Sequence, residues 1–188
     1  LPWRHLLPSM PAYFLLARAR SLLGDLAGAQ QAIHLLEDTI YGAPYPFPLT
    51  YLRGLAVQFE LSQGNLEAAQ HWQRTSKLTI HDTPQPLQTF EYFILARILL
   101  AQNQPEGIVK FFDFLLYLAR MLNFMRSALE VLTLQALALD MQGDHAAATN
   151  KLVEALRLAE PEDYRRMFLD KGEPMKRMLM HVRDEALA

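Results

Sequence analysis

The side chains that could perform acid–base, metal or nucleophilic chemistry are scattered along this sequence of 188 residues. Three carboxylates near one another, those of Glu160, Glu162 and Asp163, flank Pro161 after a helical pattern, where they are better placed to cap the next helix than to form an acid–base pair. No histidine lies four residues from another or in a His-Glu-x-x-His motif, no serine has the context of a nucleophile elbow, and there is no cysteine. The histidines are His5, His34, His71, His81, His145 and His181. We therefore expect no enzyme, no metal site and no cofactor in this chain.

Arginine and aromatic side chains offer better prospects for binding. Guanidinium groups bind carboxylates and other anions through paired hydrogen bonds, and aromatic rings offer flat apolar area. Such side chains recur six, ten and thirteen positions before the first residues of four turn motifs. A site that they line could hold a sugar, an anion or a peptide carboxylate. The candidate ligand-binding residues are Arg18, Tyr51, Gln58, Phe90, Phe93, Arg97 and Glu130. The alternative is that the arginines are solvated and the rings belong to the core.

The four turn motifs indicate an internal repeat. They begin at Gly24, Gly64, Asn103 and Gly143, which lie 40, 39 and 40 positions apart. Runs rich in leucine and alanine flank each motif, with apolar residues at intervals of three and four, as in amphipathic helices. Glycine or asparagine after a helix can adopt the left-handed C-cap conformation. The pattern predicts helix, tight turn and helix in each unit, with Pro105 at a helix start.

Small and polar residues recur around these turns. Asp25, Asn65 and Asp144 can accept hydrogen bonds from the first free amides of the following helix. Small residues stand seven positions before each turn and five positions after it, where the two helices of a hairpin must approach closely. These residues are Ala17, Val57, Ala96 and Ala136, then Ala29, Ala69, Ile108 and Ala148. Because Val57 and Ile108 are larger, we expect a looser or shifted contact at those two positions.

The repeats predict a single all-α domain over residues 1–188. The hairpins are expected at residues 9–42, 47–82, 87–123 and 125–160, and proline-rich linkers separate the first three. Segment 161–188 is expected to form capping helices around a Lys171-Gly172-Glu173-Pro174 turn, because the open end of a helical stack exposes core residues.

A run from Phe111 to Leu118 is apolar on nearly all sides of its predicted helix, which requires burial on several sides or contact with a partner. Packing by a neighbouring long helix is one explanation, and a homodimer contact is the other. The candidate interface residues are Phe111, Phe114, Leu115 and Leu118. We exclude a membrane span over Phe111–Phe124, because the stretch is short and Asp113 and Arg120 interrupt it.

The amino-acid composition excludes further classes of protein. Half of the chain, 51%, is hydrophobic, so it can bury a core, and the formal net charge of −2 gives no basic face for direct contact with nucleic acid. The lack of cysteine is compatible with a reducing compartment, so we expect a cytoplasmic location and no membrane contact. Because the chain starts at Leu1 without a signal peptide pattern, we expect a fragment of a longer protein.

Two stretches carry a family resemblance. They are Leu95–Glu106 (LARILLAQNQPE) and Leu156–Met175 (LRLAEPEDYRRMFLDKGEPM). The helix–turn–helix unit with alanine at its crossings resembles a tetratricopeptide repeat lengthened from about 34 to about 40 residues. Together with the two stretches, it is similar to the helical-repeat region of MalT-type regulators, the ATP-dependent LuxR family of transcriptional regulators.

The resemblance implies a right-handed superhelix in which the candidate binding residues face a concave groove. In this family a nucleotide-binding module precedes the repeats and a LuxR-type helix-turn-helix follows them. The repeats sense a small-molecule inducer or a regulatory protein and help to control self-association. This chain has no phosphate-binding loop, so ATP is expected only in the N-terminal module of such a regulator. The alternative is a generic tetratricopeptide scaffold for protein–protein interaction, although the lysine-rich or asparagine-rich peptide clamps expected of it are missing from the matched positions.

Overall fold

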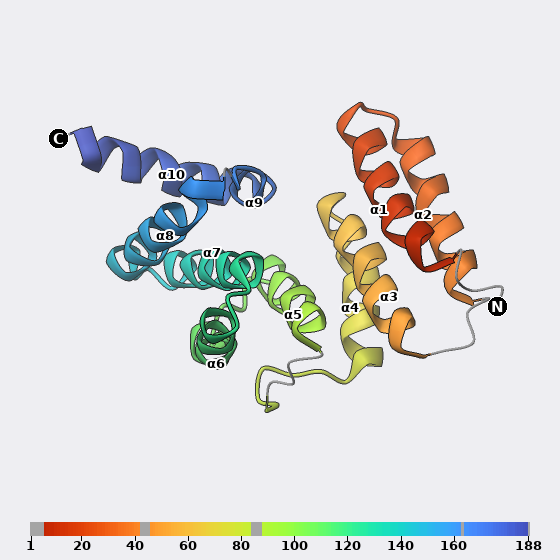
Figure 1. Ribbon diagram of the computed structural model, residues 1–188, viewed down its shortest axis with the longest axis horizontal. Coiled ribbons are helices and arrows are strands. Elements are labelled where there is room, and N and C mark those ends of the chain that lie inside the picture. Colours follow the sequence, from red (N-terminus) through yellow and green to blue (C-terminus); the bar gives the residue numbers. More distant parts are fainter. Residues whose placement is uncertain (1–5, 42–45, 84–87, 163, 188) are drawn as a thin grey trace. The chain divides into compact units, whose positions relative to one another are not determined.

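The structure is a computed structural model in which the chain is helical throughout the described part, apart from turns and loops (Figure 1). It describes the backbone of residues 6–41, 46–83, 88–162 and 164–187, and the side chains within 12–38, 53–54, 56–83, 88–161 and 164–185. The chain divides into two compact units, Leu1–Leu78 and Thr79–Ala188. The all-α prediction is confirmed, whereas the single domain and the right-handed superhelix stay predictions.

The described helices of residues 1–78 pair as two hairpins. α1 (Leu6–Leu22) and α2 (Leu26–Tyr41) form the first hairpin, and α3 (Pro46–Ser62) and α4 (Leu66–Ser76) form the second. Because α3 packs against α1, α2 and α4, the second hairpin stacks on the first (Figure 1). Buried residues of this unit include Ala17, Ala29, Ile33, Leu36, Phe59, Ala69 and Trp72.

In residues 79–188, α7 is the central helix. The helices are α5 (Thr89–Ala101), α6 (Ile108–Met121), α7 (Met125–Met141), α8 (His145–Ala159), a 3₁₀ turn (Glu160–Glu162), α9 (Arg166–Leu169) and α10 (Gly172–Leu187). α7 packs against α5, α6, α8 and α9, and every side chain from Ala128 to Ala138 is buried. α10 packs against α8 and α9 and so covers the end of the stack (Figure 1).

The four predicted turns are confirmed in their backbone conformation. Gly24, Gly64 and Gly143 have φ angles of 80°, 79° and 82°, and Asn103 has a φ of 58°. These values lie in the left-handed region that glycine tolerates best and asparagine next. The chain therefore ends α1, α3, α5 and α7 and reverses its direction at the predicted positions.

The predicted N-caps are also confirmed. A side-chain oxygen accepts a hydrogen bond from the backbone N–H three residues later at the start of α2, α4 and α8. The bonds join Asp25 to Gly28 (2.9 Å), Asn65 to Ala68 (3.4 Å) and Asp144 to Ala147 (3.1 Å). Each bond satisfies one of the amides that has no partner within its helix.

The matched crossing positions are buried, as predicted from their small size. The six alanines and Val57 and Ile108 all have exposed fractions of 7% or less. At the third hairpin, where Ile108 replaces alanine, aromatic rings fill the space between α5 and α6. The ring centroids of Phe93 and Phe112 lie 5.8 Å apart, and those of Tyr92 and Phe111 lie 5.0 Å apart.

Two local predictions were wrong. Pro105 does not begin a helix, because α6 starts at Ile108 after a further turn in which Gly107 has a φ of 79°. The carbonyl of Pro105 instead accepts a hydrogen bond at 3.0 Å from the side chain of Gln142, the residue after α7. The predicted turn at Lys171–Pro174 is shorter, because α10 already begins at Gly172. Proline is tolerated in the first turn of a helix, where its missing N–H has no partner to lose.

Candidate functional site

The predicted ligand-binding residues fall in both units, so they are not described as one site. In residues 1–78, Arg18 on α1 and Gln58 on α3 are both half-buried. Tyr51 also belongs to α3, but its side chain lies outside the described residues. The other four, Phe90, Phe93, Arg97 and Glu130, lie in residues 79–188.

Arg97, Glu130 and Lys171 form a charge cluster that joins α5, α7 and the turn before α10. Arg97 Nη2 donates a hydrogen bond to Glu130 Oε1 at 2.6 Å, and Lys171 Nζ donates to the same oxygen at 2.5 Å. The side chains of Glu130 and Lys171 are each 8% exposed, and that of Arg97 is 21% exposed. Two cations therefore meet one carboxylate in a place that is largely shielded from water.

Burial and charge change the protonation equilibria of the charge cluster. Burial raises the pKa of Glu130, but the positive charges and hydrogen bonds of Arg97 and Lys171 outweigh it and lower the pKa to about 2. Burial and the nearby charge of Arg97 lower the pKa of Lys171 from 10.5 to about 8, although the Glu130 and Asp170 carboxylates oppose both effects. Glu130 and Lys171 are therefore both charged in neutral solution.

One donor of the charge cluster is unsatisfied among the described residues. Arg97 Nη1 is buried and has no hydrogen-bond partner there. A buried N–H without a partner is costly, and more so on a charged group. Arg97 therefore retains one unused hydrogen-bond donor beside the shared carboxylate.

Lys171 was not among the predicted site residues. It lies in the Leu156–Met175 stretch, 41 residues from Glu130, and no local spacing rule connects the two. The repeat register placed Arg97 and Glu130 on first helices of successive hairpins. It could not place the turn before α10, because that segment lies outside the repeat.

The aromatic candidates on α5 differ from the prediction. Phe93 is only 8% exposed and packs against Phe112, so it supports the core between α5 and α6 instead of lining an open groove. Phe90, one turn earlier, is half-buried. For Phe93, the alternative of a core ring is therefore correct.

The candidate interface on α6 is also partly core. Phe111 and Leu115 are 8% and 3% exposed and face the interior, so they were wrongly assigned to an interface, and Leu118 is half-buried. Phe114 is 46% exposed, as a contact residue must be. Two residues that the prediction missed, Tyr117 and Met121, are 57% and 66% exposed. Phe114, Tyr117 and Met121 follow an i, i+3, i+7 spacing and so share one side of α6, here called the α6 outer face.

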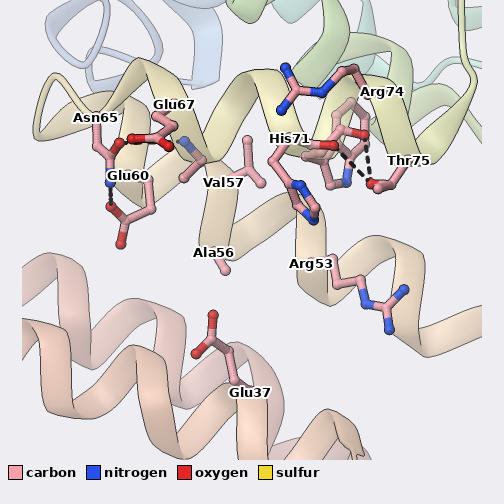
Figure 2. Close-up of a pocket in the computed structure, with 12 residues that line it drawn as sticks. Glu37, Arg53, Ala56, Val57, Glu60, Asn65, Glu67, His71, Arg74 and Thr75 are labelled. Atoms are coloured by element: carbon pink, nitrogen blue, oxygen red, sulfur yellow. Dashed lines mark hydrogen bonds between the residues drawn. The ribbon is translucent and has the colours of Figure 1, made fainter.

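A cleft of about 620 Å³ lies in residues 1–78 between α2 and α4, with α3 as its floor. Figure 2 shows the acidic side chains of Glu60 and Glu67 toward one end and the basic side chains of Arg53 and Arg74 toward the other. Trp72, which is 4% exposed, forms part of the lining. The separated charges suit a ligand that carries both signs. Of the predicted ligand-binding residues whose side chains the structure describes, none lines this cleft.

The described residues contain neither a metal-binding cluster nor a membrane-spanning helix. No group of three or more histidine, aspartate and glutamate side chains there is placed to hold a metal ion. No helix within the described ranges is long and apolar enough to cross a membrane.

Comparison with known proteins identifies the repeat. The family model described as the MalT-like TPR region matches residues 3–185, nearly the whole chain. No curated protein and no solved structure matches the chain. The family match agrees with the hairpins at a period of about 40 residues and with the buried alanines at their crossings. The chain therefore belongs to the MalT-like tetratricopeptide repeat family.

Proposed function

We propose that this chain is the effector-sensing and oligomerisation module of a MalT-like regulator of the LuxR family, acting in the cytoplasm. A small-molecule inducer or a regulatory protein binds the concave groove that the resemblance to tetratricopeptide repeats implies. The bound state then changes the association of the whole regulator, because a ligand shifts an equilibrium toward the state that it binds more tightly.

The charge cluster is the observation that carries this proposal. A sensor must connect its binding surface to the segment that follows the repeats. Glu130 on α7 holds Arg97 on α5 and Lys171 beside α10 through one oxygen atom. An effector that draws Arg97 away from Glu130 alters the charge balance at Lys171, which lies between the capping helices α9 and α10. Binding at the first helices and docking of the cap are thereby coupled.

The α6 outer face supports the oligomerisation part of the proposal. Its three large apolar side chains lie together on the surface, where burial against another subunit would remove them from water. Because α6 is the second helix of its hairpin, this face stays available while an effector occupies the first helices.

A generic scaffold is the alternative function, since tetratricopeptide-like repeats commonly mediate protein interactions. A scaffold would bind an extended peptide without a change in its own association. The effector-sensing module is expected to change its association state when its effector binds.

Differential scanning fluorimetry with a panel of sugars, nucleotides and metabolite carboxylates tests the sensing role. A ligand that binds only the folded state raises the melting temperature. We expect the shift to disappear in Arg97→Ala and to weaken in Arg97→Lys, which keeps the charge but loses the paired hydrogen bonds. Arg126→Ala, at an exposed position near the start of α7, is the matched control. A well-folded protein without any shift would count against a small-molecule effector and favour a regulatory protein.

A further inference from the structure

The cleft between α2 and α4 carries its charges in a regular pattern. Arg53 and Glu60 lie seven residues apart on α3. Glu67 and Arg74 lie seven residues apart on α4. Seven residues make two helical turns, so the two side chains of each helix leave the same side of it about 10 Å apart. Because α3 and α4 reverse direction at the Gly64 turn, both glutamates lie at the turn end of the cleft and both arginines at the other end (Figure 2).

Within the described part of the chain, none of these four charged side chains forms an ion pair. Glu60 accepts hydrogen bonds from the side-chain amides of Asn65 at 2.7 Å and Gln30 at 3.3 Å, but both donors are neutral. Residues 39–52, whose side chains the structure does not describe, include no aspartate, glutamate, lysine, arginine or histidine. The four charges therefore face the cleft without a counter-charge from these parts of the chain.

A further carboxylate of the cleft, that of Glu37 on α2, already has a partner. Its Oε2 lies 3.2 Å from Nδ1 of His34. The remaining pattern is two negative charges at one end and two positive charges at the other, with neither sign in excess. A ligand with a single charge would be attracted at one end and repelled at the other. A ligand with an ammonium group and a carboxylate about 10 Å apart would be attracted at both ends.

The middle of the cleft combines apolar contact with a polar group. Ala56, Val57 and Trp72 are buried and line it. His71, one turn from Glu67 toward the arginines, is exposed, and its imidazole can donate or accept a hydrogen bond. This lining suits a chain of amide groups with small side chains better than a bare hydrocarbon, which would leave the imidazole without a partner. The volume of about 620 Å³ is ample for such a chain.

We propose that the cleft between α2 and α4 binds a short peptide with free termini, about three residues long in an extended conformation. Its ammonium group lies between Glu60 and Glu67, and its carboxylate lies at Arg53 and Arg74, where guanidinium groups form charge-assisted hydrogen bonds. Three extended residues span about 10 Å, which matches the separation of the charges. None of the described residues predicted for the concave groove lines this cleft, so the site does not depend on the proposed effector.

Isothermal titration of the chain with trialanine tests the site. We expect saturable binding with a Kd of about 1 mM or tighter, as for a small ligand held by charged contacts at two ends. Acetylation of the N-terminus or amidation of the C-terminus should each weaken binding at least about fivefold, since each removes one charge. Dialanine, which is too short to reach both ends, should also bind more weakly. Failure of trialanine to bind up to about 10 mM, or equal binding of the doubly blocked peptide, would overturn the proposal.

Variants locate the two ends of the peptide. The double variant Arg53→Gln/Arg74→Gln changes only exposed residues, so the fold should persist, as circular dichroism can verify. We expect it to bind trialanine at least about tenfold more weakly and to lose its discrimination against the amidated peptide, because the two changes remove the same contact. In Glu67→Gln, acetylation of the peptide should matter less than in the native chain.

Lys77→Gln is the matched control, because it removes a positive charge from an exposed residue at the end of α4 that does not line the cleft. It should bind trialanine as the native chain does. If amidation still weakened binding to the double arginine variant as much as to the native chain, the carboxylate would not lie at the arginines, and the assignment of the site would be wrong.

Discussion

The amino group of Lys171 lies 2.5 Å from Oε1 of Glu130, although 41 residues separate the two in the sequence. The same oxygen binds Arg97, 33 residues away in the other direction. A single carboxylate on α7 thus holds both an earlier hairpin and the capping segment. Removal of Glu130 and removal of Lys171 should have different consequences, because the two changes leave different charges buried.

Glu130→Gln should be strongly destabilising. The change leaves Arg97 and Lys171 beside each other without the carboxylate that binds both, and loss of one partner of a buried ion pair costs about 3–5 kcal/mol of the free energy of unfolding. Lys171→Met should cost much less, because Glu130 keeps Arg97 as its partner and the methionine side chain fills a similar volume.

Urea unfolding can show whether a variant loses stability in residues 79–188 or in residues 1–78. Both tryptophans, Trp3 and Trp72, precede residue 79, so tryptophan fluorescence reports residues 1–78 and serves as an internal reference. Circular dichroism follows the helices of both units. If Lys171→Met lowered the stability as much as Glu130→Gln, the shared carboxylate would not be the centre of the charge cluster.

Acid should weaken the charge cluster through Glu130. Its pKa is about 2 in the folded protein and near 4.5 without the cluster, so the folded state binds the proton less tightly than the unfolded state. The resulting stabilisation is complete above pH 4.5 and is lost as the pH falls from 4.5 toward 2. It amounts to about 3 kcal/mol. Urea titrations at several acidic pH values should show this loss in the native chain and not in Glu130→Gln.

Alkaline solution should instead raise the free energy of unfolding, through Lys171. Burial lowers its pKa from 10.5 to about 8, so between these values the unfolded state holds more protons than the folded state. The free energy of unfolding should therefore rise across this interval relative to that of Lys171→Met. Other titrating groups are common to both chains and cancel in the difference. A difference that stays constant from pH 7 to pH 10.5 would mean that Lys171 titrates at its ordinary pKa.

Gly143→Ala should cost about 1 kcal/mol. An added methyl group at this position would meet no atom within 4 Å, so the cost comes only from the φ angle of 82°. Gly143→Asn should lose less, because asparagine tolerates the left-handed region better. Thermal unfolding of the two variants checks which of them loses more stability. Equal losses of stability would argue against backbone strain as the cause.

Charges on the α6 outer face should weaken self-association. Phe114→Glu and Tyr117→Glu alter exposed positions, so the helix content should not change. Sedimentation velocity over a range of concentrations should show dissociation in the variants if this face is the contact between subunits. Arg120→Glu would also break an ion pair with Glu154, so Lys110→Glu, at an exposed position on the same helix, is the better control.

The sequence was sufficient to predict the hairpins, because their signals are local. Turn glycines, capping side chains and crossing alanines each act within a few residues, and a period of about 40 repeats them along the chain. Lys171 could not be found in this way, because it lies outside the repeat register and its partner Glu130 lies on α7, before α8 and α9. The prediction that Phe93 lines an open groove failed for a related reason. A position that faces the groove in a repeat of small residues becomes core when the opposite helix carries Phe112.

The continuous burial of α7 has a consequence for the order in which the molecule opens. Eleven consecutive residues, Ala128 to Ala138, are buried there, and neighbours cover the helix from several directions. Its amide hydrogens can exchange with solvent only after surrounding elements have separated. The amides of α10, which covers the end of the stack, can be released by detachment of the cap alone. Deuterium should therefore enter α10 early and the middle of α7 last, which makes α7 the slowest-exchanging unit of residues 79–188.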